Sequence, residues 1–181
     1  FGILGLLTYK DSTGYDLTKT FEDSLNNFWH AQSSQIYREL NRMEEEGLVK
    51  SRSVIQDGRP NKRLYSITGA GREAFSKWLR EAEVEIENPH HTMLVRVFFG
   101  ADDPESTLAM LKKLREQCLN VLEANCSETR RNIDNYAGIV PDGKVKRQYW
   151  LMTMDLGIAK TQAIADWAQR CIEQIEKEVV Q

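Results

Sequence analysis

The stretch from residue 33 to residue 71 constrains the fold of this 181-residue chain more than any other. It begins with a polar segment, residues 33–46, in which apolar side chains recur every three or four positions, at Ile36, Leu40 and Met43. That spacing places the three side chains on one side of a helix and leaves the other side polar. The segment is therefore predicted to be an amphipathic helix that packs along a narrow stripe and exposes a wide polar face.

Both ends of this helix carry recognisable signals. Ser33 is expected to be the N-cap, because its hydroxyl can accept a hydrogen bond from a free backbone N–H of the first turn. Gly47 is expected to end the helix, and an apolar contact between Leu48 and Met43 is expected to accompany a Schellman turn there.

Two strands and a basic turn are predicted after the helix. Residues 48–55 and 63–68 are rich in strand-forming side chains and alternate in part, as strands do. Between them, Asp-Gly and Arg-Pro dipeptides predict a turn over residues 56–62. Thr68 is expected to cap a further helix. A helix followed by a β-hairpin and a new helix is the pattern of a winged helix, a helix-turn-helix unit with an attached hairpin.

Cations, amides and hydroxyls gather on the polar side of the helix and at the turn. Such groups can form bidentate bonds with base edges in a major groove or pair with phosphate, and a cationic hairpin tip can touch a backbone or a minor groove. An ordinary amphipathic helix and a solvated turn are the alternative interpretations. The residues predicted to contact DNA are Tyr15, Ser33, Ser34, Gln35, Tyr37, Arg38, Arg42, Arg59, Lys62 and Arg63.

The residues before this stretch predict two more helices. Residues 1–9 are apolar and are expected to be the end of a first helix, preceded by further residues because the sequence does not begin with methionine. Ser12 or Thr13 is expected to cap a second helix, with Asp16 favourably placed in its first turn. At the start of that helix, Tyr15 is either a phosphate contact or a half-buried packing residue, and the sequence leaves both open.

Charge is divided unevenly along the chain. The net charge of −3 argues at first against a nucleic-acid partner. Residues 1–80, however, carry 12 Lys and Arg against 10 Asp and Glu, whereas residues 81–181 carry 12 against 17. The positive surplus therefore lies with the helix and hairpin, and it predicts a moderate, strongly salt-dependent affinity for any duplex DNA.

Several other classes of protein are not expected. The three cysteines, Cys118, Cys126 and Cys171, are too few and too scattered for a disulfide framework, so a reducing cytoplasm is expected. The sequence shows no signal peptide, membrane span, phosphate loop, nucleophile elbow or HExxH motif. His90 and His91 are adjacent without a third ligand nearby, so no metal is predicted. We expect a protein that is not an enzyme and needs no cofactor.

The second half of the chain predicts long helices. A domain boundary is expected at about residues 82–91, because the residue before a proline is pushed out of helical space. Thr92 to Phe99 is predicted to be a short helix, and Asp103 with the following proline predicts the start of a long one reaching about residue 136. A last helix is predicted over residues 144–179. It is apolar on more than one stripe and therefore needs more than one partner.

One stripe of the last helix recurs in steps of three and four, which is a heptad seam. A second copy of the chain is the expected cover, because a two-fold interface buries the same patch on both subunits. Packing within its own domain is the alternative. Trp150 and Trp167 are candidate effector-binding residues, with core or interface packing as the alternative. The residues predicted to form the dimer interface are Leu151, Met154, Ile158, Thr161, Ala165, Ala168 and Ile172.

The chain resembles the PadR family of bacterial transcriptional regulators over nearly its whole length. The matching segments are ILGLL (3–7), GYDL (14–17), SSQIYRELNRMEEEGLV (33–49), GRPNKRLYSITGAGREAF (58–75) and YWLMTMDLGIAKTQAIADWAQRCIEQIE (149–176). The resemblance implies an N-terminal winged-helix DNA-binding domain and a C-terminal helical dimerisation domain. Members are mostly repressors, and some respond to small aromatic or cationic compounds.

We therefore expect a mainly α-helical fold with a small β-hairpin. Residues 1–82 are expected to be the winged-helix DNA-binding domain and residues 92–181 the helical dimerisation and effector domain, with a linker at about 83–91. The expected function is that of a dimeric repressor reading a pseudo-palindromic operator, with helix 33–46 in the major groove and the wing, residues 56–63, on flanking backbone. The expected partners are duplex DNA, a second copy and a small-molecule effector. The alternative is a winged helix used only for protein–protein contact.

Overall fold

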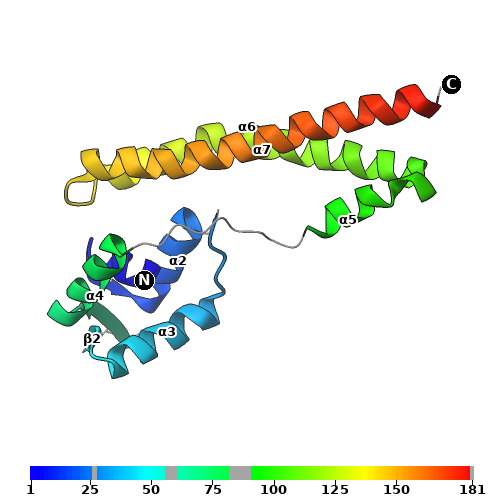
Figure 1. Ribbon diagram of the computed structural model, residues 1–181. Helices are drawn as coiled ribbons and strands as arrows, with labels where there is room; N and C mark the ends of the chain where they lie inside the picture. Colours follow the sequence, from blue (N-terminus) through cyan, green and yellow to red (C-terminus); the bar gives the residue numbers. More distant parts are fainter. Residues whose placement is uncertain (26–27, 56–60, 82–90, 180–181) are drawn as a thin grey trace. The chain divides into compact units, whose positions relative to one another are not determined.

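The computed structural model describes residues 1–25, 28–55, 61–81 and 91–179. The chain divides into two compact units, residues 1–85 and 86–181 (Figure 1). Most of the linker expected at residues 83–91 lies outside the described residues. The prediction of a mainly helical fold with a small sheet is confirmed, and the sheet gains a short third strand.

The first unit combines four helices with one antiparallel sheet. Strand order in the sheet is β1-β3-β2, so the hairpin strand β3 lies in the centre. Pairing brings Ser12 opposite Tyr65 and Val49 opposite Ile67. The elements of this unit are α1 (Gly2–Leu7), β1 (Ser12–Thr13), α2 (Gly14–Ser24), α3 (Ser33–Glu45), β2 (Val49–Val54), β3 (Lys62–Ile67) and α4 (Gly69–Arg80).

The core of this unit joins every helix to the hairpin. Complete burial of one aliphatic side chain in this core stabilises the folded protein by about 1.5–3 kcal/mol relative to leaving it exposed. The apolar stripe predicted for α3 is confirmed, because Ile36, Leu40 and Met43 are all buried. The largest fully buried side chains here are Leu4, Leu7, Leu17, Ile36, Leu40 and Val49.

Local signals set most helix ends. Thr13 caps α2 in a capping box with Asp16, and the Thr68 hydroxyl accepts from the Gly71 N–H at 3.0 Å. At the end of α3 the Leu48 N–H donates to the Met43 carbonyl at 2.8 Å, and Gly47 has φ +71°. The predicted Schellman turn is therefore confirmed, since only a residue that tolerates positive φ can occupy its centre.

The predicted N-cap of α3 needs a correction. Ser33 is the first helical residue, and Gln32 is the cap. The Gln32 N–H donates to the side-chain carbonyl of Gln35 at 2.8 Å. Extended backbone at Gln32 and this reciprocal amide contact supply the cap in place of a serine hydroxyl.

The second unit is a long helical hairpin with a short helix before it. Its elements are α5 (Thr92–Phe98), the 3-10 turn η1 (Gly100–Asp102), α6 (Pro104–Ala137) and α7 (Gly143–Val179). Asp103 caps α6 by accepting from the Ser106 N–H at 3.0 Å, as predicted. The two long helices run side by side and are joined by a short connection (Figure 1). Within the described ranges, no helix combines the length and apolarity that crossing a bilayer requires.

Part of the heptad seam of α7 packs against α6 of its own chain, which is the alternative to its predicted role as the dimer interface. Ala168 and Ile172 form a buried cluster with Leu111 of α6. Two salt bridges also join α6 and α7: Lys112 pairs with Glu176 beside this cluster, and Arg147 pairs with Asp134 near the connection between the helices. In a single chain, Met154, Ala165, Ala168 and Ile172 are buried, and Leu151, Ile158 and Thr161 are half-buried.

Candidate nucleic-acid interface

The side of α3 opposite its buried stripe is a continuous polar surface. Because the buried stripe uses Ile36, Leu40 and Met43, the helix cannot turn its remaining side chains inward. Ser34, Gln35, Arg38 and Arg42 lie on this polar side. Ser33 and Tyr37 are also exposed, but Ser33 lies in the first turn three residues before Ile36, and the Tyr37 ring lies against α2.

These polar side chains differ in whether they already form hydrogen bonds or ion pairs within the protein. Within the described part of the chain, the Arg38 guanidinium has no hydrogen-bond or ion-pair partner. Arg42 lies 2.7 Å from Glu39 and 3.8 Å from Glu46, both one turn away on the same helix. Gln35 holds the cap of the helix through its carbonyl oxygen. Arg38 is therefore the cation best placed to bind a ligand at no cost in existing contacts.

Tyr37 and Tyr15 line a shallow groove between α2 and α3. Tyr15 is 71% exposed and Tyr37 45% exposed, so neither is a core residue. The Tyr37 ring packs on the start of α2, where a Cβ at Gly14 would lie 2.4 Å from its Cε1 atom. The groove is lined by Tyr15, Thr18, Lys19, Glu22, Asp23, Ser33 and Tyr37.

The hairpin does not present its cations as one cluster. Lys62 and Arg63 are consecutive in β3, so their side chains point to opposite faces of the sheet. Lys62 is exposed on the outer face, whereas Arg63 turns toward α3. Arg59 lies outside the described residues.

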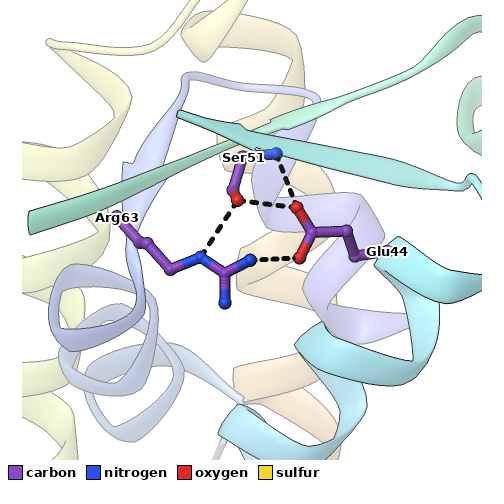
Figure 2. A network of polar contacts seen from close by, with 3 residues as sticks. All are labelled: Glu44, Ser51 and Arg63. Carbon is purple, nitrogen blue, oxygen red and sulfur yellow. Dashed lines mark hydrogen bonds and ion pairs between the residues drawn. The ribbon is translucent and has the colours of Figure 1, made fainter. Parts of the chain in front are cut away.

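Arg63 is held in a polar network at the junction of α3, β2 and β3, which Figure 2 shows. Its Nη2 donates to Oε2 of Glu44 at 2.5 Å, and its Nε donates to the Ser51 hydroxyl at 3.1 Å. Its guanidinium also lies 5.5 Å from the centroid of the Tyr65 ring. Arg63, which was predicted to contact DNA from a cationic hairpin tip, is thus paired with Glu44 in this structure.

The hydrogen bond from the Ser51 hydroxyl is the largest influence on the pKa of the Glu44 carboxyl and lowers it below its ordinary value. Burial opposes this shift, and the Arg63 charge and the Ser51 backbone N–H add to it. Burial raises the pKa of the Tyr65 hydroxyl. The network therefore keeps Glu44 ionised and accepting.

Two cations on the outer face of the hairpin were missed by the sequence reasoning. Lys50 and Arg52 are exposed on β2, and register places Val54 opposite Lys62. Because alternate residues of a strand share a face, Lys50 and Arg52 lie on the face that carries Lys62. The period-two pattern of Lys-Ser-Arg in residues 50–52 was the signal that could have revealed them.

The two candidate effector tryptophans have different surroundings. Trp150 is half-buried, with its ring centroid 5.8 Å from that of Tyr136. Trp167 packs against the buried cluster between α6 and α7. Trp167 is half-buried at the edge of that cluster, which agrees with the packing role considered for it as an alternative.

Comparisons with known proteins cover both units. The model of the "Transcriptional regulator PadR-like family" matches residues 3–77, and that of the "Virulence activator alpha C-term" family matches residues 90–176. The "Negative transcriptional regulator PadR" of Bacillus subtilis is 33% identical over 99 residues, which are 55% of this chain and 54% of that protein. The chain thus spans about half the length of this relative. The "Probable transcriptional regulator Rv1176c" of Mycobacterium tuberculosis is 28% identical over 97% of this chain and 96% of its own length.

Solved structures with the same fold match this chain over almost its whole length. A PadR-like regulator from Bacillus cereus, 29% identical, has a TM-score of 0.70 and matches over 96% of this chain and 92% of its own. Bacillus subtilis PadR shares the fold in its complex with operator DNA, with a TM-score of 0.80 at 22% identity, and in its complex with p-coumaric acid, with a TM-score of 0.74 at 20% identity; each match covers 96% of both chains. The chain belongs to the PadR-like family of transcriptional regulators.

Proposed function

We propose that this regulator is a homodimeric repressor that reads a pseudo-palindromic operator in duplex DNA. Residues 1–82 are its DNA-binding domain and residues 92–181 its dimerisation domain. The observation that carries the proposal is the polar side of α3, where Arg38 has no hydrogen-bond or ion-pair partner among the described residues and lies beside exposed polar side chains. Repression is supported by the name of the Bacillus subtilis relative, and duplex DNA by that protein's complex with its operator.

In this proposal α3 lies in the major groove. Arg38 is the base-reading side chain, because an unpaired guanidinium can form two bonds to a guanine edge. Ser33, Ser34 and Tyr15 surround the start of the helix, where backbone N–H groups favour phosphate. Lys62, with Lys50 and Arg52 on the same face of the hairpin, neutralises flanking backbone.

The dimer surface that we propose is the exposed stripe of α7 opposite the seam packed on α6. It follows steps of three and four, so it shares one side of the helix. Apolar side chains exposed in a row on a single chain indicate an interface, and small residues in the row permit close approach of two helices. The stripe consists of Tyr149, Met152, Leu156, Ala159 and Ala163.

A small aromatic effector is also proposed, bound in the second unit beside Trp150. The Bacillus subtilis complex with p-coumaric acid supports this chemical class. Trp150 offers a half-buried ring next to Tyr136, whereas Trp167 packs against the cluster between α6 and α7. Titration of the protein with p-coumaric acid tests this: quenching of tryptophan fluorescence should disappear in Trp150→Phe and persist in Trp29→Phe.

Fluorescence anisotropy tests DNA recognition directly. The probe is a duplex enriched by the wild-type protein from a randomised library, compared with an unselected duplex. Arg38→Ala should weaken binding to the enriched duplex by about 1–3 kcal/mol and reduce the preference over the unselected one. Arg72→Ala, which removes an exposed cation from α4, is the matched control. Equal affinity of the wild type for both duplexes would refute sequence-specific recognition and favour a protein–protein role for the winged helix.

A further inference from the structure

We propose that Glu44 is a positioning residue for DNA recognition. We further propose that Arg63 belongs to the same network of Glu44, Ser51 and Arg63, which we call the lock, instead of contacting DNA. In this view the Glu44 carboxylate ties the hairpin to the end of α3, so that the helix and the wing meet a duplex at a set spacing. The inference rests on the proposed function of α3 and the wing.

The contacts form a closed ring (Figure 2). Oε1 of Glu44 accepts from the Ser51 hydroxyl at 2.6 Å and from the Ser51 backbone N–H at 3.0 Å. Oε2 accepts from Nη2 of Arg63 at 2.5 Å, and Nε of Arg63 donates to the Ser51 hydroxyl at 3.1 Å. One carboxylate thus accepts three hydrogen bonds from two strands.

The position of Ser51 explains why a helix side chain is needed here. Strand β2 lies at the edge of the sheet, so its outward N–H groups have no strand partner. The Ser51 N–H is one of these, and Glu44 supplies the acceptor. A contact with a charged acceptor is stronger than a neutral one. Glu44 therefore fastens the free edge of the hairpin to the helix.

Arg63 reaches the same carboxylate from the central strand. Register places Arg63 opposite Ser53, and its side chain runs diagonally to Ser51. The Tyr65 ring, two residues along and buried, supports the guanidinium from the sheet. Together these contacts hold both strands of the hairpin to one turn of α3.

The direction in which DNA affinity changes when Glu44 is neutralised distinguishes a positioning role from simple electrostatic repulsion of phosphate. A carboxylate near the DNA-facing surface repels phosphate, so neutralising it should tighten binding if charge were all that mattered. If Glu44 positions the wing, neutralising it should weaken binding instead. Glu44→Gln retains a carbonyl that can accept from Ser51, but it replaces the acceptor for Arg63 with an NH₂ group that cannot accept.

The test compares Glu44→Gln with Glu45→Gln in the full-length protein. Glu45 is exposed on the next position of α3, and within the described residues it has no hydrogen-bond or ion-pair partner. Both variants remove one negative charge. With the enriched duplex described above, Glu44→Gln should bind about tenfold more weakly than Glu45→Gln. Arg63→Gln should weaken binding comparably, and the double variant should be no weaker than Arg63→Gln alone.

The salt dependence decides the role of Arg63. Loss of a phosphate contact reduces the slope of log K against log salt by about 0.9. Arg63→Gln should leave the slope at the wild-type value, whereas Lys62→Gln should reduce it. A reduced slope for Arg63→Gln, or binding by Glu44→Gln as tight as that of Glu45→Gln, would overturn the proposal.

Hydrogen exchange of the DNA-free protein tests the lock without any ligand. The Ser51 amide should exchange about tenfold faster in Glu44→Ala than in Glu45→Ala, because only the first variant removes its acceptor. Equal exchange in the two variants would show that the lock does not hold the strand. If the wild type binds the enriched and the unselected duplex with equal affinity, the proposed function fails, and a role of Glu44 in sequence recognition fails with it. The exchange result then still reports the lock by itself.

Discussion

Gly71 of α4 lies directly against the carbonyl oxygen of Leu48, so that a Cβ at Gly71 would come within 2.1 Å of that oxygen. The same carbonyl accepts from the Thr68 N–H at 3.0 Å and from the Thr68 hydroxyl at 3.0 Å. The start of α4 is therefore packed on the turn that ends α3. The position of α3 therefore depends on backbone contacts at its C-terminal end.

Gly71→Ala should destabilise the protein markedly. The added methyl meets backbone, which cannot move aside as a flexible side chain could, so we expect a loss of about 3 kcal/mol in the free energy of unfolding. Gly69→Ala, two residues earlier in the same helix, is the control, because a Cβ there meets no atom of the described residues within 4 Å. Urea denaturation of the two variants should show the loss only for Gly71→Ala. Equal stability would contradict the packing.

Gly14→Ala should impair DNA binding more than stability. A Cβ at Gly14 would lie 2.4 Å from the Tyr37 ring, and because this ring is partly exposed it can swing away at a cost of about 1 kcal/mol. The displaced ring changes the groove between α2 and α3. Anisotropy with the enriched duplex and urea denaturation should therefore show weaker binding with a small loss of stability. An unchanged affinity would remove Tyr37 from the recognition surface.

Stability should depend on pH through Glu44. Its folded pKa is lowered, first by hydrogen bonds from Ser51 and then by the Arg63 charge, so the stabilisation is fully present above the ordinary value of 4.5. It is lost as pH falls through the lowered folded pKa. Urea denaturation should show wild type more stable than Glu44→Gln at pH 7, with the difference shrinking below about pH 4.5. A difference independent of pH would show that the network does not depend on ionised Glu44.

Leu156→Glu should prevent the proposed dimer from forming. Leu156 is 58% exposed in the single chain and lies mid-stripe on α7, where two buried carboxylates facing each other across a two-fold axis would repel. Light scattering at micromolar concentration should report a dimer for wild type and a monomer for the variant. Gln117→Glu, an exposed position on α6, adds the same charge as a control. A monomeric wild type would contradict the proposed assembly.

Local chemistry made much of this fold predictable. The apolar spacing of Ile36, Leu40 and Met43 predicted α3, and Gly47 predicted its end. Asp103 before a proline predicted the start of α6. Each of these signals acts within about four residues, through capping hydrogen bonds or through one turn of helix. It can therefore be recognised from residues that are close together in the sequence. The segment from residue 33 to residue 49 also carries part of the family resemblance.

Long-range packing decided the rest. Two stripes of α7 share the same steps of three and four, and periodicity cannot say which one meets α6. The seam through Met154 and Ala165 is buried within the chain, and the stripe through Leu156 is left exposed. Arg63 is one letter from Lys62 in the sequence, yet strand alternation sends it to Glu44, nineteen residues away along the chain. Sequence by itself determined the helices, most of their ends and the class of protein. Only the tertiary structure decided which apolar face of α7 packs on α6 and which of the two neighbouring cations pairs with Glu44, because these contacts join residues far apart in the chain.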